Sequence, residues 1–194
     1  LVLRGWHCVT PVLLGILGQG AAGAAAATSF ESIATTTVGS GGASSVTFTD
    51  GGAWTGYKHL QIRITARSNY AGTSDYMTLT APSAGTWYHL LYGDGSTAGA
   101  VGSNYVKLIT LMPGATSTAS VFGTAIVDIL DFANTNKTKT MRSLNGYDAN
   151  GSGRVGLYSA NIDTTSAIST ITFASDNGAG FAQYSSFALY GIKA

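Results

Sequence analysis

The feature that most constrains this chain is a series of short strand-like segments between Phe30 and Ile192. They are rich in β-branched and aromatic residues and are separated by Gly, Asn, Asp and Ser, a spacing typical of sandwiches and barrels. No stretch among them has a convincing helical period, so the strands are expected to pair antiparallel. We therefore predict an all-β fold, an antiparallel two-sheet β-sandwich of jelly-roll-like type, with about ten strands.

The clearest single strand is His59–Ala66, in which apolar and polar residues alternate. This period of two predicts one inward face, formed by Leu60, Ile62, Ile64 and Ala66. The other expected strands outside the central hairpin cover residues 33–38, 45–49, 76–80, 87–92, 105–111, 154–158, 169–173 and 184–192.

The centre of the fold is expected to be one long hairpin between Val121 and Leu144. Its first arm, Val121–Phe132, is mostly apolar, which is typical of a central strand covered on both faces. The second arm, Thr138–Leu144, has no cleanly apolar face. Asn134–Asn136 joins the arms, since Asn tolerates positive φ and bonds its own backbone.

Charged side chains are scarce in this chain. They make up 10% of the 194 residues, against about 25% in an average soluble domain. The net charge of +1 provides no basic patch, so we expect no nucleic-acid partner. Cys8 is the single cysteine, which excludes an internal disulfide. So uncharged a surface suits a protein packed in an assembly, and we expect a homo-oligomer.

Residues 1–27 differ from the rest of the chain. Arg4, the apolar run Val9–Leu17 and a Gly/Ala tract match the pattern of a secretory signal peptide. A membrane span is disfavoured because Pro11 and Gln19 interrupt a short run. Because the segment is retained in the chain, we expect an anchoring arm over 1–27 and a sandwich domain over 28–194. The residues expected to contact a partner are Leu13, Leu14, Ile16 and Leu17.

Two motifs in the chain have alternative interpretations. Gly18–Gly23 reads GxGxxG, but neither a following helix nor a suitably placed acidic residue supports a dinucleotide site, so no cofactor is expected. Asp148–Gly153 matches the first half of an EF-hand loop, but the twelfth position is Ser159. Since Asn150-Gly151 is a strong hairpin signal, we predict a tight turn there instead of a calcium site.

Catalytic and metal-binding patterns find little support. The three histidines, His7, His59 and His89, are isolated in sequence, and lone strand histidines are usually structural, so no metal site is expected. No GxSxG segment occurs and Cys8 lies in the arm, so nucleophilic hydrolysis has no support in the sequence. A glycan hydrolase needs paired carboxylates, whereas the nine acidic residues are scattered. We therefore expect a protein that is not an enzyme.

Aromatic residues gather in the first half of the chain, near Gly/Ser loops. Such side chains form carbohydrate platforms or protein contact surfaces, although for any single one of them packing in a sandwich core is the more common role. The residues considered for a surface contact are Trp54, Tyr70, Trp87 and Tyr88.

Several segments resemble a family of small structural proteins of tailed bacteriophages. The resemblance covers nearly all of the chain from Leu13 onward and is spread over many short segments instead of one motif. It is carried by Leu14–Leu17, Ser32–Thr35, His59–Arg63, His89, Gly93–Gly95, Asp128–Asp131, Asn134–Lys137, Gly146–Asp148 and Phe181–Lys193. It implies that residues 1–12 are an upstream extension. The chain departs from the family at Thr80–Trp87 and Ser159–Ile162, which are expected to be variable loops.

The resemblance implies a non-enzymatic virion protein located on the extracellular phage particle. The expected role is a tail-fibre or appendage module, a homotrimer, which docks on other virion proteins through its arm and contacts host-surface glycans. The alternative is a capsid decoration (cement) protein that stabilises the head. Neither role requires a cofactor, a membrane or nucleic acid.

Overall fold

The computed structural model describes residues 29–82, 87–103 and 108–193. Within these ranges it contains twelve strands and no helix, and all strand pairs are antiparallel. The predicted all-β sandwich is thereby confirmed. The strands are β1 (Phe30–Thr37), β2 (Ser45–Thr49), β3 (His59–Ala66), β4 (Ser74–Thr80), β5 (Tyr88–Gly93), β6 (Ala98–Ser103), β7 (Leu108–Pro113), β8 (Gly123–Ile129), β9 (Lys139–Asp148), β10 (Gly153–Ile162), β11 (Thr170–Ser175) and β12 (Ser186–Ile192).

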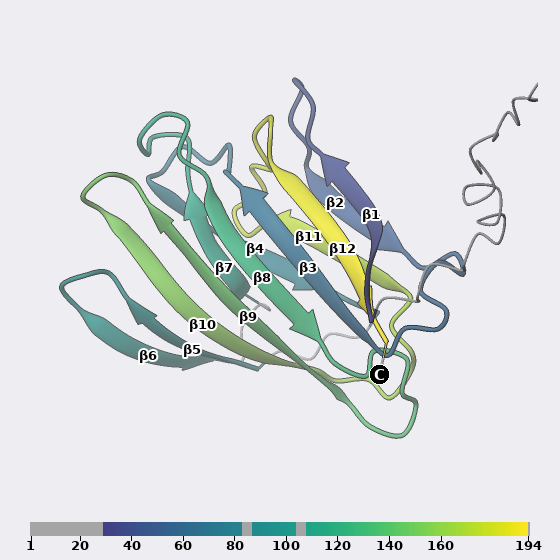
Figure 1. Cartoon of the computed structure of the whole chain (residues 1–194). Helices are drawn as coiled ribbons and strands as arrows, with labels where there is room; N and C mark the ends of the chain where they lie inside the picture. Colours follow the sequence, from purple (N-terminus) through teal and green to yellow (C-terminus); the bar gives the residue numbers. More distant parts are fainter. Residues whose placement is uncertain (1–28, 83–86, 104–107, 194) are drawn as a thin grey trace, which may run out of the picture.

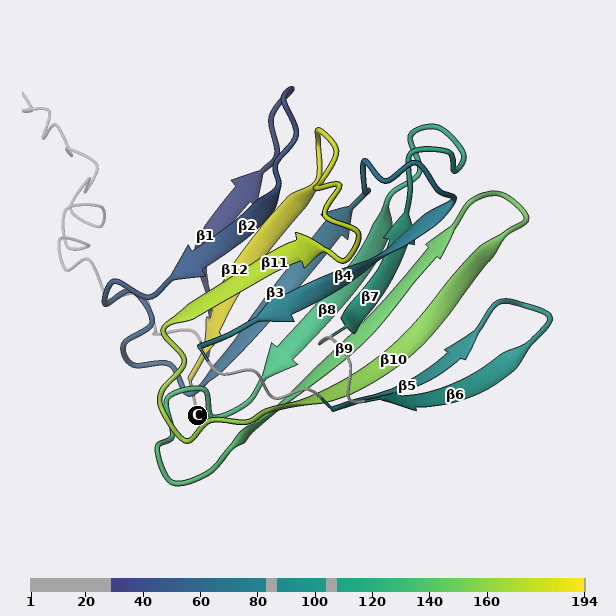
Figure 2. The same ribbon diagram turned by 180° about the vertical axis from the view of Figure 1, so that it is seen from behind.

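The two sheets differ in size. The large sheet has eight strands in the order β1-β12-β3-β8-β9-β10-β5-β6, and the small sheet has four in the order β2-β11-β4-β7. Figure 1 views the large sheet from its outer face, with the small sheet behind it, and Figure 2 shows the small sheet in front. The small sheet covers only part of its partner, and β5 and β6 extend beyond β7 (Figure 2).

The core lies between the sheets and is dense in aromatic rings. Phe187 of β12 lies 5.5 Å from Phe173 of β11 and 5.0 Å from Phe181, measured between ring centroids. All three rings are fully buried. The inward residues predicted for β3 are buried as well, so the alternation in His59–Ala66 is confirmed. Large apolar side chains of this kind each contribute about 1.5–3 kcal/mol on burial.

The predicted central hairpin exists as β8 and β9, which lie in the middle of the large sheet. The prediction that its first arm is covered on both faces is wrong. Residues of β8 alternate between buried and exposed, and Ile126 is 41% exposed on the outer face. The physical reason is that the small sheet packs on one side of β8 only. One face of β8 is therefore buried and the other is exposed to solvent.

The buried face of β9 carries polar residues, which explains its unclear sequence pattern. Lys139, Ser143 and Asn145 point inward together with Met141. The Lys139 amine donates to the carbonyl oxygens of Thr164 (3.1 Å) and Ser166 (2.5 Å). Asn145 donates to the Ile109 carbonyl at 3.3 Å. These bonds offset the cost of burying polar groups.

One strand has no counterpart in the sequence prediction. Ala98–Ser103 forms β6 although it has two glycines and no apolar alternation. It is a strand because β5 offers it a complete antiparallel register. The pairing of an edge strand depends on its neighbour more than on its own side chains.

The turn between β9 and β10 is as predicted. Asn150 and Gly151 both have positive φ, 62° and 105°, and the Ala149 amide donates to the Ser152 carbonyl at 2.6 Å. Positive φ at both central residues is what a two-residue hairpin turn of type I′ requires.

Candidate functional site

The most unusual surface of the molecule is an outer apolar patch on the large sheet, formed by Leu91, Ile126, Leu144, Val155 and Leu157. These side chains are between 41% and 59% exposed. Ile126, Leu144, Leu157 and Leu91 are directly opposite one another on β8, β9, β10 and β5. They form one continuous apolar row across four neighbouring strands.

The patch faces solvent because of the register of these strands. The residues next to each member along the chain fill the core, for example Val127, Tyr158 and Leu90, which are 0–3% exposed. In a strand, successive side chains point to opposite faces, so the members of the patch must point outward. The outer face has no second layer in the described part of the chain.

Glycines give the patch its relief. Val155 is opposite Gly146 on β9 and Gly93 on β5, so it projects between two positions that carry no side chain. The nearest neighbours of a side chain placed at either glycine would be Val155 atoms or backbone atoms at 3.4 Å or more. The surface therefore projects at Val155 and is recessed at the two glycines. Side chains of facing sheets interdigitate on surfaces of this kind.

Two of the charges beside the patch are paired within the sheet. Asp128 accepts a hydrogen bond from Gln61 at 2.9 Å and forms an ion pair with Arg142, also at 2.9 Å. Asp128 and Arg142 are each two residues from a member of the patch on the same strand, so they lie on the same face. Arg63, directly opposite Ile126 on β3, is a third charge at this border, and its Nε atom donates to Gln61 at 3.2 Å.

The residues predicted for surface contact fall into two groups. Trp54 is 2% exposed and packs edge-on against Phe132 at 5.7 Å, and Tyr88 is 7% exposed. Both belong to the core, so the surface-contact prediction is wrong for them; in each case burial of a large ring between the sheets outweighs the polar edge of the side chain. Tyr70 and Trp87 are exposed.

Tyr70 and Trp87 do not form a common surface. Tyr70 lies four residues after the end of β3, whereas Trp87 lies directly before the first residue of β5. The register places these two strand ends at opposite ends of the sandwich. The predicted arm contacts Leu13, Leu14, Ile16 and Leu17 and the glycine motif at 18–23 lie outside the described residues.

Three titratable side chains that lie near strand ends, Asp75, Asp131 and His59, take part in structural contacts. Asp75 is 1% exposed and accepts hydrogen bonds from Ser68 (2.6 Å), Ser175 (2.5 Å) and Asn177 (2.7 Å). Asp131 bonds Lys137, and this hydrogen bond lowers the pKa of the Asp131 carboxyl. The Nδ1 atom of His59 accepts from the Asp131 amide at 2.9 Å. These contacts tie loops to strands.

Two classes of site are not found in the part of the chain that the structure describes. No three His, Cys, Asp or Glu side chains come close enough there to hold a metal ion. Nor do these residues include a helix of the length and hydrophobicity needed to cross a bilayer. Comparison with known proteins found no match among family models, curated proteins or solved structures.

The outer apolar patch could not be read from the sequence. Its members come from four segments, and each contributes one or two apolar residues that could equally point inward. The available signal was Leu144, which sits among polar residues on one face of the second arm.

Proposed function

We propose that this chain is a non-enzymatic structural subunit of a tailed-phage particle, a fibre or appendage module that associates with further copies through the outer apolar patch. The observation that carries the proposal is the exposed row of Ile126, Leu144, Leu157 and Leu91. The phage context rests on the distributed sequence resemblance. The arm at residues 1–27 is proposed to dock the subunit on other virion proteins.

The exposure and continuity of the patch support an assembly role. Its five side chains are each 41–59% exposed and form one contiguous apolar surface, and contiguous exposed apolar patches mark sites of protein association. A net charge of +1 provides little repulsion between copies.

Sedimentation velocity on the full chain tests the association. We expect the wild type to form a defined oligomer at micromolar concentration and Leu144→Asp to shift it to the monomer, because a carboxylate buried in an apolar contact has no partner. Thr35→Asp is the matched control. Thr35 is exposed and belongs to the same cross-strand row, four strands away on β1. A monomeric wild type, or a Leu144→Asp oligomer as stable as the control, contradicts the proposed association.

The place of the protein on a particle needs a separate experiment. Mass spectrometry of purified tailed-phage particles that carry this gene should detect the chain at a fixed ratio to the major capsid protein. Immunogold labelling then locates it on the head or the tail. A chain that occurs in the lysate but is absent from purified particles contradicts the virion role.

A further inference from the structure

Three connections meet at one end of the sandwich. They are the β5–β6 turn (residues 94–97), the β9–β10 turn (149–152) and the β7–β8 connection (114–122). Figure 1 shows all three at the same end of the strands. Two adjoining pockets, of about 350 and 570 Å³, lie among them. We call this region the loop-end pocket; the residues common to both parts are Asp94, Tyr147, Gly151, Ser152 and Gly153.

The longest of these connections is held rigid by a buried arginine. Arg67 is 9% exposed. Its guanidinium donates to four carbonyl oxygens of the β7–β8 connection, those of Ala115 (3.3 Å), Ser117 (2.9 Å), Thr118 (2.7 Å) and Val121 (2.9 Å). Hydrogen bonds from a charged donor are stronger than neutral ones. The connection therefore keeps one shape without a ligand.

The two turns are also preorganised. The Thr118 hydroxyl donates to the Ala149 carbonyl at 2.7 Å, which ties the β7–β8 connection to the β9–β10 turn. Oδ1 of Asp94 accepts from the amides of Ser96 (2.9 Å) and Thr97 (2.6 Å), and these bonds lower the pKa of the Asp94 carboxyl. A site whose loops are already ordered loses less entropy on binding.

The polar side chains that line the larger part are alcohols, one phenol and one carboxylate. In the larger part, hydroxyls and the Asp94 carboxylate outnumber apolar groups, and none of its lining residues is Lys or Arg; the polar side chains are Thr73, Asp94, Ser96, Thr116, Ser117, Thr118, Tyr147 and Ser152. Hydroxyls both donate and accept, and a carboxylate accepts. The tyrosine ring offers an apolar face with a polar edge. This combination matches a ligand with many hydroxyls, weakly polar C–H faces and no negative charge.

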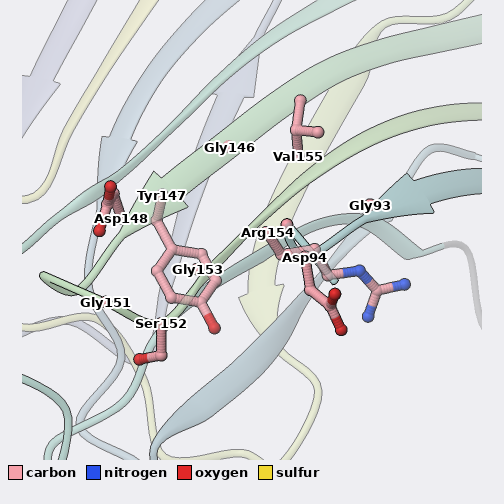
Figure 3. Close-up of a pocket in the computed structure, with 11 residues that line it drawn as sticks. Gly93, Asp94, Gly146, Tyr147, Asp148, Gly151, Ser152, Gly153, Arg154 and Val155 are labelled. Carbon is pink, nitrogen blue, oxygen red and sulfur yellow. The ribbon is translucent and has the colours of Figure 1, made fainter. Parts of the chain in front are cut away.

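The smaller part adds one positively charged side chain, Arg154. Arg154 lies with its guanidinium carbon 3.8 Å from the centre of the Tyr92 ring and donates to the Tyr76 hydroxyl at 3.2 Å. Its Nε atom is buried and has no hydrogen-bond partner among the described residues. In Figure 3 this side chain and Asp94 extend to the same side, whereas Val155 of the outer apolar patch points the other way. Val155 and the glycines opposite it, Gly93 and Gly146, also line the smaller part, so the pocket adjoins the outer apolar patch at Val155.

We propose that the loop-end pocket binds an uncharged oligosaccharide. Its volume lies within the range of about 300–1,000 Å³ typical of small-molecule sites. Its lining carries two carboxylates, Asp94 and Asp148, against one cation, Arg154. The net negative charge disfavours acidic sugars and phosphates by like-charge repulsion. The site uses other residues than the four aromatic ones predicted from the sequence. Its larger part, which contains Ser117 and Ser152, includes no member of the outer apolar patch.

A glycan array probed with the labelled full chain tests the assignment. The printed probes are neutral oligosaccharides, namely maltotriose, cellotriose, chitotriose and lactose, beside acidic 3′-sialyllactose. We expect binding to at least one neutral probe, and calorimetry should show that Ser152→Trp, which fills the pocket, weakens it by at least about tenfold. Ser40→Trp is the matched control, at an exposed turn by the opposite edge of the large sheet, and should bind like wild type.

A second, smaller substitution keeps the proposal testable if Ser152→Trp does not fold. Ser117→Ala removes one hydroxyl from the lining and should weaken binding about threefold to tenfold with an unchanged melting temperature. Binding to the acidic probe alone, no binding to any probe, or binding that neither variant weakens overturns the proposal. Sedimentation of the same variants reports separately on the association through the patch.

Discussion

At the scale of single residues, the inner face of the large sheet buries polar groups whose bonding is incomplete. The hydroxyls of Tyr158 and Ser143 have no hydrogen-bond partner within the described chain, and the two residues are opposite each other on β10 and β9. Burial raises the pKa of Tyr158 and lowers the pKa of Lys139. Each such group costs stability relative to an apolar side chain of the same shape.

Replacing Tyr158 with Phe is expected to leave stability at pH 7 unchanged or to raise it by up to about 1 kcal/mol, since it removes a buried unpaired hydroxyl. The gain should grow above pH 10. The folded pKa of Tyr158 is raised, so the unfolded chain releases its phenol proton first, and wild-type stability falls as the pH rises past the unfolded value of about 10. Urea unfolding at pH 7 and pH 10.5 measures both differences. A Phe variant that is less stable at pH 7 would show that the hydroxyl has a partner.

At the scale of elements, the two sheets are joined by loops that are held by side chains from strand ends. Arg67, directly after β3, fixes the β7–β8 connection. Asp75 of β4 bonds Ser175 of β11, and it also bonds Ser68 and Asn177 in adjoining loops. These contacts hold the loops at this end of the sandwich against the strands.

Replacing Arg67 with Met should destabilise the domain by about 2–4 kcal/mol, because several carbonyl oxygens of the β7–β8 connection lose their donor. Amides of residues 115–121 should then exchange with deuterium faster than those of β3 and β8. Arg142→Met is the control: Arg142 is 65% exposed and forms a surface ion pair, which is worth about 0–1 kcal/mol. Equal losses for the two variants would contradict a special role for Arg67.

At the scale of the whole molecule, all twelve strands of the described residues lie between Phe30 and Ile192, outside residues 1–27. The last backbone bond toward the arm joins the Lys193 amide to the Ser29 carbonyl at 2.9 Å. The two sheets share one core, so the unfolding of this part should be cooperative.

Deleting residues 1–27 should therefore leave the domain folded, with a melting temperature within about 3 °C of the full chain, which corresponds to about 1 kcal/mol for a domain of this size. Circular dichroism measures the transition. The truncated protein should be absent from purified particles if the arm docks the subunit. A truncated chain that does not fold, or one that still enters particles, contradicts the assembly role of the arm.

The sequence by itself determined the class of fold and much of its local structure. Alternation in His59–Ala66 predicted β3 and its inward face, Asn150-Gly151 predicted the turn, and the apolar run before Asn134 predicted the central hairpin. These features depend on neighbours along the chain, through side-chain direction and allowed φ. Two described segments were missed. Ala98–Ser103 was not expected as a strand because its small side chains have no period, and Ser159–Ile162, expected to be a loop, is the end of β10.

Only the tertiary structure decided which surfaces are covered and which are free. A period of two separates the faces of a strand, but it does not say which face meets another layer. The small sheet packs on one face of the large sheet only, so Ile126 and Leu144 on the other face meet water while Trp54 and Tyr88 fill the core. The apolar patch and the loop-end pocket both join segments far apart in sequence. Their existence depends on register and sheet order, which arise from the packing of the whole chain.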